Sequence, residues 1–242
     1  MSRTKLLLSA ILLMLLCVIT VAPVFADDTI IGSPADAGTG NCFPFGCAYS
    51  GEYQQVYTSS QFATGPVLIT GLEFFNTQYN GGATGMNSGN WAISLSTTSS
   101  DWSTISTTYA NNIGPVDNTL VFNGDLSQPW SFGNTLTIAL TNPFNYDPSQ
   151  GNLLMDVNVT GASDLNGVIY FDTNGFNGGS FDGNNIMGRD YSGGTDGNVN
   201  NGYGLVTDFT TTNPVPEPST LLMLGTGLLG LGPFLRRGLR IL

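Results

Sequence analysis

The spacing of two cysteines points to a specific kind of bond. Cys42 and Cys47 enclose the segment from Phe43 to Gly46. A redox-active pair has two intervening residues, and two thiolates without histidine make a poor zinc site. In an oxidising compartment we therefore expect a structural disulfide between Cys42 and Cys47. Closing so small a loop contributes about 2 kcal/mol in the chain-entropy model. Free thiols are the alternative.

Residue types that the chain lacks exclude most catalytic systems. The 242 residues include no histidine, and the one lysine is Lys5. Histidine acid–base chemistry, Ser-His-Asp and Cys-His nucleophiles, histidine metal sites and lysine Schiff bases are therefore excluded from the body of the chain. A glycosidase needs two carboxylates, but Glu52 and Glu73 are the only glutamates of residues 27–213, and nothing marks a pair with an aspartate. We expect no enzymatic activity.

A stretch rich in aspartate, asparagine and glycine is the candidate cation site. Residues 172–204 contain ten glycines, and the candidate metal ligands are Asp172, Asp182, Asp190 and Asp196. Calcium takes six to eight oxygen ligands, which carboxylates and amides in glycine-rich loops can supply. Tight turns use the same residue types, and no EF-hand loop is present. Turn composition is therefore the alternative, and we expect no obligatory cofactor.

Aromatic side chains are the candidate sugar-stacking groups. Trp91, Ile93 and Leu95 occupy every second position, so they share one face of a strand, and this pattern predicts that Trp91 lies in the core. Trp102 and Trp130 fall outside clean alternation, and they are the better candidates for stacking on a sugar.

The charge of the body excludes one class of partner. Residues 27–213 hold 16 acidic residues and one basic residue, Arg189, for a formal charge of −15. Such a surface repels phosphate backbones, so nucleic-acid binding is excluded. We expect Arg189 to form an ion pair with Asp190 or another nearby acid.

Alternation of apolar and polar residues predicts the elements that position these groups. A period of two recurs around residues 91–95, 136–140 and 153–159, and no long helical period is present in the body. Further strands are expected at residues 53–58, 67–75, 119–122, 168–171 and 203–211. About eight strands separated by Gly, Asn, Asp and Pro clusters fit one all-β domain, an antiparallel β-sandwich of jelly-roll type.

The N-terminus has the pattern of a secretory signal peptide. Arg3 and Lys5 precede an apolar run from Leu6 to about Val21, and the segment ends in Val24-Phe25-Ala26. This order predicts export through the Sec machinery and cleavage by signal peptidase after Ala26. An uncleaved membrane anchor is the alternative.

The C-terminus has the pattern of a short membrane span. Residues 219–235 are largely Leu and Gly, and about 25 Å of helix at 1.5 Å per residue is just enough to cross the hydrocarbon core. Three arginines follow at once, which keeps that end in the cytoplasm and the body on the far side. These stop residues are Arg236, Arg237 and Arg240.

The residues before this span carry a family resemblance. Pro216-Glu217-Pro218, the short Gly/Leu-rich span and the terminal arginines resemble the PEP-CTERM sorting signal of Gram-negative bacteria. The resemblance implies that exosortase, a membrane-embedded cysteine enzyme, processes the chain near this motif. It also implies an association with exopolysaccharide or biofilm. Segments of the body, among them residues 53–57 and 146–154, resemble a domain found ahead of such signals, but the resemblance implies no activity.

These observations together predict three segments and one route through the cell. They are a signal peptide (1–26), a β-sandwich domain (27–213) and a PEP-CTERM sorting signal (214–242). We expect an exported, exosortase-processed protein that passes through the inner membrane to the cell surface or extracellular matrix, with a non-catalytic body. The alternative is a carbohydrate-binding, lectin-like module that uses calcium. The ligand of the body and its oligomeric state do not follow from the sequence.

Overall fold

The computed structural model describes residues 26–34, 39–163, 167–177, 180–181, 186–192 and 197–212. These residues form an all-β structure in which the strands of every sheet pair antiparallel. The helical turns of the described residues are of the 3-10 type, such as η2 (Ser59–Gln61) and η3 (Tyr109–Asn111). Within the same ranges, no helix has the length and apolarity needed to cross a membrane.

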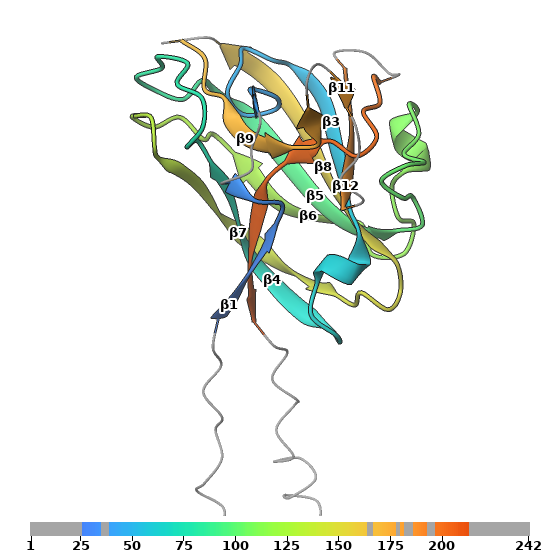
Figure 1. The fold of residues 1–242 in the computed structure, drawn as a ribbon. Helices are drawn as coiled ribbons and strands as arrows, with labels where there is room; N and C mark the ends of the chain where they lie inside the picture. Colours follow the sequence, from blue (N-terminus) through green and yellow to red (C-terminus); the bar gives the residue numbers. More distant parts are fainter. Residues whose placement is uncertain are drawn as a thin grey trace, which may run out of the picture.

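Two main sheets make up the body (Figure 1). The first has the strand order β1-β14-β4-β7, from β1 (Ala26–Ile31), β14 (Thr207–Thr212), β4 (Val67–Phe75) and β7 (Thr135–Tyr146). The second has the order β12-β3-β8-β5-β6, from β12 (Met187–Ser192), β3 (Gly51–Tyr57), β8 (Asn152–Ser163), β5 (Ser88–Thr98) and β6 (Thr119–Gly124). A small sheet, β13 (Gly204–Leu205), β9 (Phe171–Asn174) and β2 (Thr39–Asn41), and a hairpin of β10 (Phe176–Asn177) and β11 (Ser180–Phe181) complete the described elements.

The alternation of the sequence determines which side chains enter the core. Along β7, the buried residues Leu136, Ile138 and Leu140 alternate with exposed ones. The same pattern on β5 buries Trp91, as its alternation predicts, and the Trp91 indole N–H donates to the carbonyl of Pro44 at 3.1 Å. One apolar core contains side chains of both main sheets, as expected for a β-sandwich.

The loop between the two cysteines is part of this core. The predicted disulfide between Cys42 and Cys47 is confirmed, with the Cα atoms 5.1 Å apart. The loop inserts Phe45, which is fully buried, against Phe74 of β4 with ring centroids 4.7 Å apart. A Cβ on Gly46 would collide with the carbonyl of Ile169, so only glycine fits there.

A long connection covers the outer face of the second sheet. Residues 99–118 link β5 to β6, and the described part of this face buries a second small apolar cluster. Val56 and Leu154 come from the sheet, and Ile105 and Ile113 come from the connection. The connection therefore shields this part of the sheet from water.

The fold extends the sequence-based expectations at several points. β4 spans residues 67–75 as predicted, whereas β1 and β12 were not predicted as strands. β12 lies inside the Gly- and Asp-rich stretch that was interpreted as loops, and it pairs with β3 over six residues. The all-β, antiparallel class is confirmed. The jelly-roll topology and the domain boundaries stay predictions.

Candidate functional site

The sorting residues predicted from the sequence lie outside the described residues. They are the motif Pro216, Glu217 and Pro218 and the stop residues Arg236, Arg237 and Arg240. The signal peptide lies outside them too, except for Ala26, the first residue of β1. The structure does describe where the body meets these segments. Ala26 pairs with Thr212 in the β1–β14 ladder, so both ends of the body lie side by side at one end of the molecule (Figure 1).

The described calcium candidates do not come together as a metal site. The carboxylate of Asp172 accepts hydrogen bonds from the Thr77 N–H at 2.9 Å, the Thr77 hydroxyl at 2.6 Å and the Gln78 N–H at 3.0 Å. Asp190 is buried on a different sheet, where it lies opposite Gln54. Asp182 and Asp196 are outside the described residues, within which no group of three acidic or cysteine side chains could hold a metal ion.

The two tryptophan candidates differ in exposure. Trp130 is buried, its indole N–H donates to Asn76 Oδ1 at 3.1 Å, and its ring packs edge-on against Phe171. Its faces are therefore not open to a sugar. Trp102 is half-buried and lies in the cover over the second sheet.

Arg189 has an environment that its sequence neighbours did not suggest. It is buried, its guanidinium lies 4.5 Å from the ring centre of Tyr191 and 4.4 Å from that of Tyr203, and its Nε–H donates to Asn200 Oδ1 at 3.0 Å. Two cation–π contacts therefore hold this cation. Arg189 and Asp190 are successive residues of β12, so their side chains point to opposite faces of the sheet.

The structure brings together two carboxyl groups that sequence reasoning did not pair. Gln54 of β3 lies between Asp190 of β12 and Asp156 of β8, and Glu52 is two residues along the same face of β3. The carboxyl groups of Asp156 and Glu52 lie close enough to affect each other's pKa. Burial and then the charge of Glu52 raise the pKa of Asp156 to about 7. Burial also raises the pKa of Glu52, while the neighbouring Asp156 opposes that rise.

Because its pKa is raised to about 7, Asp156 keeps a large protonated fraction at neutral pH. The neighbouring Gln54 is fully buried, and it accepts from Asn112 at 2.9 Å and donates to the Tyr109 carbonyl at 3.2 Å. The two carboxyl groups therefore lie beneath the cover, beside a hydrogen-bonded carboxamide that the cover holds in place.

A second group of acids lies on the outer face of the first sheet. Asp208 of β14 faces Glu73 of β4 in register, and Asp28 of β1 lies two pairs away from Asp208 along the β1–β14 ladder. Burial raises the pKa of Asp208 to about 6, and the charges of Asp28 and Glu73 add to the rise. Glu73 also accepts a hydrogen bond from the hydroxyl of Thr137 at 3.1 Å. Like charges directly opposite each other destabilise a sheet, so other contacts of the fold must offset the repulsion among these three acids.

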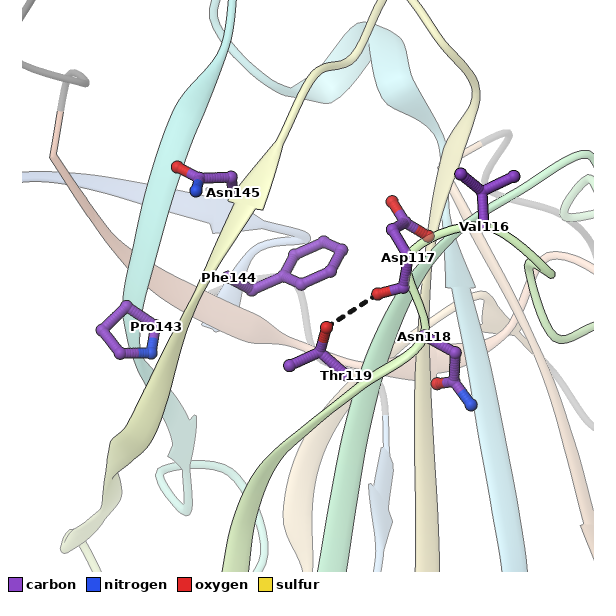
Figure 2. A pocket seen from close by; sticks show the side chains of 7 residues that line it. All are labelled: Val116, Asp117, Asn118, Thr119, Pro143, Phe144 and Asn145. Carbon is purple, nitrogen blue, oxygen red and sulfur yellow. Dashed lines mark hydrogen bonds between the residues drawn. The ribbon is translucent and has the colours of Figure 1, made fainter.

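A hollow of about 320 Å³ lies where β6 and β7 face each other (Figure 2). The Phe144 ring points into it toward Thr119 of β6, and residues 116–118, just before β6, line the same side as Thr119; Pro143 and Asn145 of β7 also line it, but their side chains point to the other side of the strand. The Thr119 hydroxyl donates to the Asp117 carbonyl at 2.8 Å, and Asp117 Oδ1 accepts from the Thr97 N–H at 2.8 Å. The rim is therefore anchored to β5.

Several exposed side chains surround the hollow, and two of them are asparagines whose carboxamides make no hydrogen bond within the described residues. Val116 is 93% exposed, and Pro143, Asn118 and Asn145 are exposed as well. Within the described residues, the side chains of Asn118 and Asn145 make no hydrogen bond, although each can both donate and accept. We refer to the hollow with these four rim residues as the β6–β7 hollow. Sequence reasoning missed it because its two sides come from segments distant along the chain.

Comparison with known proteins gives one finding for the C-terminal segment. Residues 214–240 match the family model described as the PEP-CTERM protein-sorting motif. No curated protein matches the chain. The match covers the motif, the apolar span and the arginines on which the resemblance rested. The chain therefore carries a PEP-CTERM sorting signal at residues 214–240, and this signal implies export, a membrane-anchored intermediate in Gram-negative bacteria and exosortase as the processing partner.

Proposed function

We propose that this protein is a non-catalytic component of the cell surface or extracellular matrix, released there by exosortase and associated with exopolysaccharide or biofilm. The sorting signal at residues 214–240 carries the proposal. The composition of the body supports it, because the body lacks histidine and lysine and has a formal charge of −15. A highly charged exterior keeps a protein dispersed in a concentrated matrix.

The proposed route has four steps. The Sec machinery exports the chain, and signal peptidase cuts after Ala26. Residues 219–235 then hold the chain in the inner membrane, with Arg236 as the first of the stop arginines. Exosortase acts near Pro216–Pro218, where the prolines keep the chain extended and free of helix. The body then moves to the surface or matrix.

The test is removal of the motif. Replacing Pro216, Glu217 and Pro218 with alanine should leave export intact and retain a full-length, membrane-bound form in a host that contains exosortase. Membrane and extracellular fractions are blotted against a tag in the body. If the alanine variant is shortened and released like the parent, exosortase does not act through this motif and the proposal is wrong.

A lectin-like body is the second candidate, favoured by the half-buried ring of Trp102. Exposed aromatic rings stack on the apolar faces of sugars. A glycan array probed with the parent and with Trp102→Ala tests this candidate, with Trp130→Phe as a control for a buried ring. Calcium-dependent binding should be lost in EDTA and should not return with Mg²⁺ at equal ionic strength. An array without binding by the parent excludes the lectin-like body.

A further inference from the structure

We propose that the body binds a neutral polysaccharide on an exposed pair of tyrosines, Tyr79 and Tyr170, at the end of the molecule opposite the one where Ala26 and Thr212 lie. The proposal rests on the proposed association with polysaccharide, and it names the surface that makes the contact. It also names the chemical class of the ligand, which is an uncharged chain of pyranose rings.

The tyrosine pair combines an open ring face with a fixed geometry. Tyr79 is 55% exposed, and its ring centroid lies 4.9 Å from that of Tyr170 with the ring planes 78° apart. Such an edge-to-face contact covers at most one face of one ring, so the exposure of Tyr79 leaves a face of its ring open to a ligand. The backbones of the two residues also form an antiparallel bridge. An open aromatic face of this kind stacks on the apolar C–H face of a pyranose.

Buried polar side chains hold both tyrosines in place. The Asn76 carboxamide is buried, and its NH2 group donates to the carbonyl of Tyr79 at 2.9 Å and to that of Tyr170 at 2.7 Å. The carboxylate of Asp172 is buried as well, and it accepts from both backbone N–H groups of residues 77–78. The loop that carries Tyr79 is therefore fixed before a ligand arrives, and a preorganised surface loses little conformational entropy on binding.

The groups around the pair suit the hydroxyl groups of a sugar. Gln78 and Asn80 flank Tyr79, and both are exposed. Gln78 Nε2 donates to the hydroxyl of Thr77 at 3.0 Å, and Asn80 Oδ1 accepts from the Gly82 N–H at 2.8 Å. Within the described ranges, the other carboxamide atoms of these two side chains and both phenol hydroxyls make no hydrogen bond. They can therefore donate to and accept from a polyhydroxylated ligand.

The absence of charge around the pair indicates a neutral ligand. Residues 74–100 and 167–171 contain no charged residue, although residues 27–213 carry a formal charge of −15. Asp172 comes next in the chain, but it is buried and hydrogen-bonded to residues 77–78. The rest of the body repels an anionic polysaccharide, whereas an uncharged chain meets no such barrier.

The small size of the aromatic surface favours a sugar over a protein partner. A stable protein interface buries about 800 Å² on each side. Of the large hydrophobic side chains that are exposed in the described residues, only Tyr79 lies in the segments 74–100 and 167–171. A Cβ on Gly81 would lie 2.9 Å from Tyr170 Cδ2, so at this position backbone borders the ring and no side chain obstructs a long ligand. One open ring with such a flank matches one pyranose of a chain.

The position of the pair suits a contact with material outside the cell. Residues 76–79 follow β4, which runs from the end where Leu68 pairs with Thr212 to Phe75 at the other end. Leu68 and Phe75 are seven residues apart, or about 23 Å at 3.3 Å per residue. Figure 1 shows the segment after β4 at the end of the body away from the start of β1 and the end of β14. A chain held in the membrane by residues 219–235 would therefore present the tyrosines outward.

The experiment measures binding of the full-length chain to immobilised polysaccharides, in a detergent without a sugar headgroup. The neutral probes are a β-1,4-glucan, a β-1,3-glucan and a galactomannan, and the acidic probes are alginate and polygalacturonate. Tyr79→Ala removes the stacking ring, and Tyr79→Trp restores a ring at the same position. Leu120→Ala is the matched control, because Leu120 is 46% exposed but lies on β6 of the second sheet.

We expect the parent to bind at least one neutral probe and neither acidic one. Tyr79→Ala should bind the neutral probe about tenfold more weakly, because it loses the ring face, while Tyr79→Trp and Leu120→Ala should bind like the parent. Tyr79 is 55% exposed, so its replacement removes little packing, and an unchanged melting temperature of Tyr79→Ala checks the fold. Parental binding by Tyr79→Ala, or binding to the acidic probes that equals or exceeds binding to the neutral ones, would overturn the proposal.

Two further outcomes separate this surface from the functions proposed above. Loss of binding in Trp102→Ala, with parental binding by Tyr79→Ala, would place the sugar at the cover and overturn the proposal, while the association with polysaccharide would stand. If the parent binds none of the five probes, the proposal fails together with that association. Release by exosortase would still stand if the variant with alanine at Pro216, Glu217 and Pro218 remains unprocessed.

Discussion

The raised pKa of Asp156 predicts that the body becomes less stable as the pH rises from about 4 to 7. Burial and the charge of Glu52 raise the pKa of Asp156 from 3.8 in the unfolded chain to about 7 in the folded one. A group whose pKa is raised on folding contributes stability that is complete below the unfolded value and is lost as the pH rises through the folded value. The loss therefore falls between about pH 4 and pH 7.

The size of the effect follows from the shift. A rise from 3.8 to about 7 corresponds to ~4 kcal/mol at 1.36 kcal/mol per pKa unit. Asp156 keeps part of its surface in water and lies beside a second carboxyl group, Glu52, so we expect about half of that value, ~2 kcal/mol. Asp208, whose pKa is raised to about 6, acts in the same direction.

The variant Asp156→Asn measures the contribution of Asp156 separately from that of Asp208. The amide is neutral at every pH and can still donate to Glu52, so the variant should be more stable than the parent at pH 8 and should show a smaller slope between pH 5 and 8. Urea unfolding of residues 27–213 followed by tryptophan fluorescence measures both. Asp147→Asn is the control: hydrogen bonds from Ser149 lower the pKa of Asp147, so it does not titrate in this range. An unchanged slope in Asp156→Asn, or a parent that gains stability above pH 5, would refute the reasoning.

Two more predictions concern single contacts of the body. Replacing Cys42 and Cys47 with serine should lower the free energy of unfolding by about 2 kcal/mol, and a reducing agent should then have no further effect on the variant in a thermal melt. Asp172→Asn should cost ~1–3 kcal/mol in urea unfolding, because its carboxylate accepts three hydrogen bonds from Thr77 and Gln78. The Asp172→Asn cost should be the same in calcium and in EDTA, and a cost that appears only with calcium would instead make Asp172 a metal ligand.

The strands that sequence reasoning found share one property. Residues 67–75 and 136–140 combine strict alternation with β-branched or aromatic residues, and such a pattern is local. β12 escaped notice because Gly188, Arg189 and Asp190 read as a turn, yet all three are buried in a paired strand. Pairing with β3 and contact with two tyrosine rings override the local preference there.

The candidate sites divide in the same way, into those that a local pattern predicts and those that depend on strand pairing. The disulfide could be predicted because Cys42 and Cys47 are only five positions apart, so a short local loop is enough to bring them together. The carboxyl pair could not, because Glu52 and Asp156 become neighbours only when β3 and β8 align in one particular register. A shift by one residue would turn either side chain to the other face. The β6–β7 hollow likewise needs two sheets to close on each other, because its two sides come from strands of different sheets.

The sequence by itself determined what is carried by short, contiguous patterns: export, the sorting signal, the all-β class, the acidic charge and the exclusion of histidine chemistry. A membrane, a signal peptidase or a sorting enzyme reads such segments in extended or helical form, so no folding is needed to recognise them. Only the tertiary structure decided which distant carboxyl groups lie together, which tryptophan is buried, and that both ends of the body pair at one end of the molecule. Those features depend on strand register and on sheet packing, where the free energy comes from contacts between residues far apart in the chain.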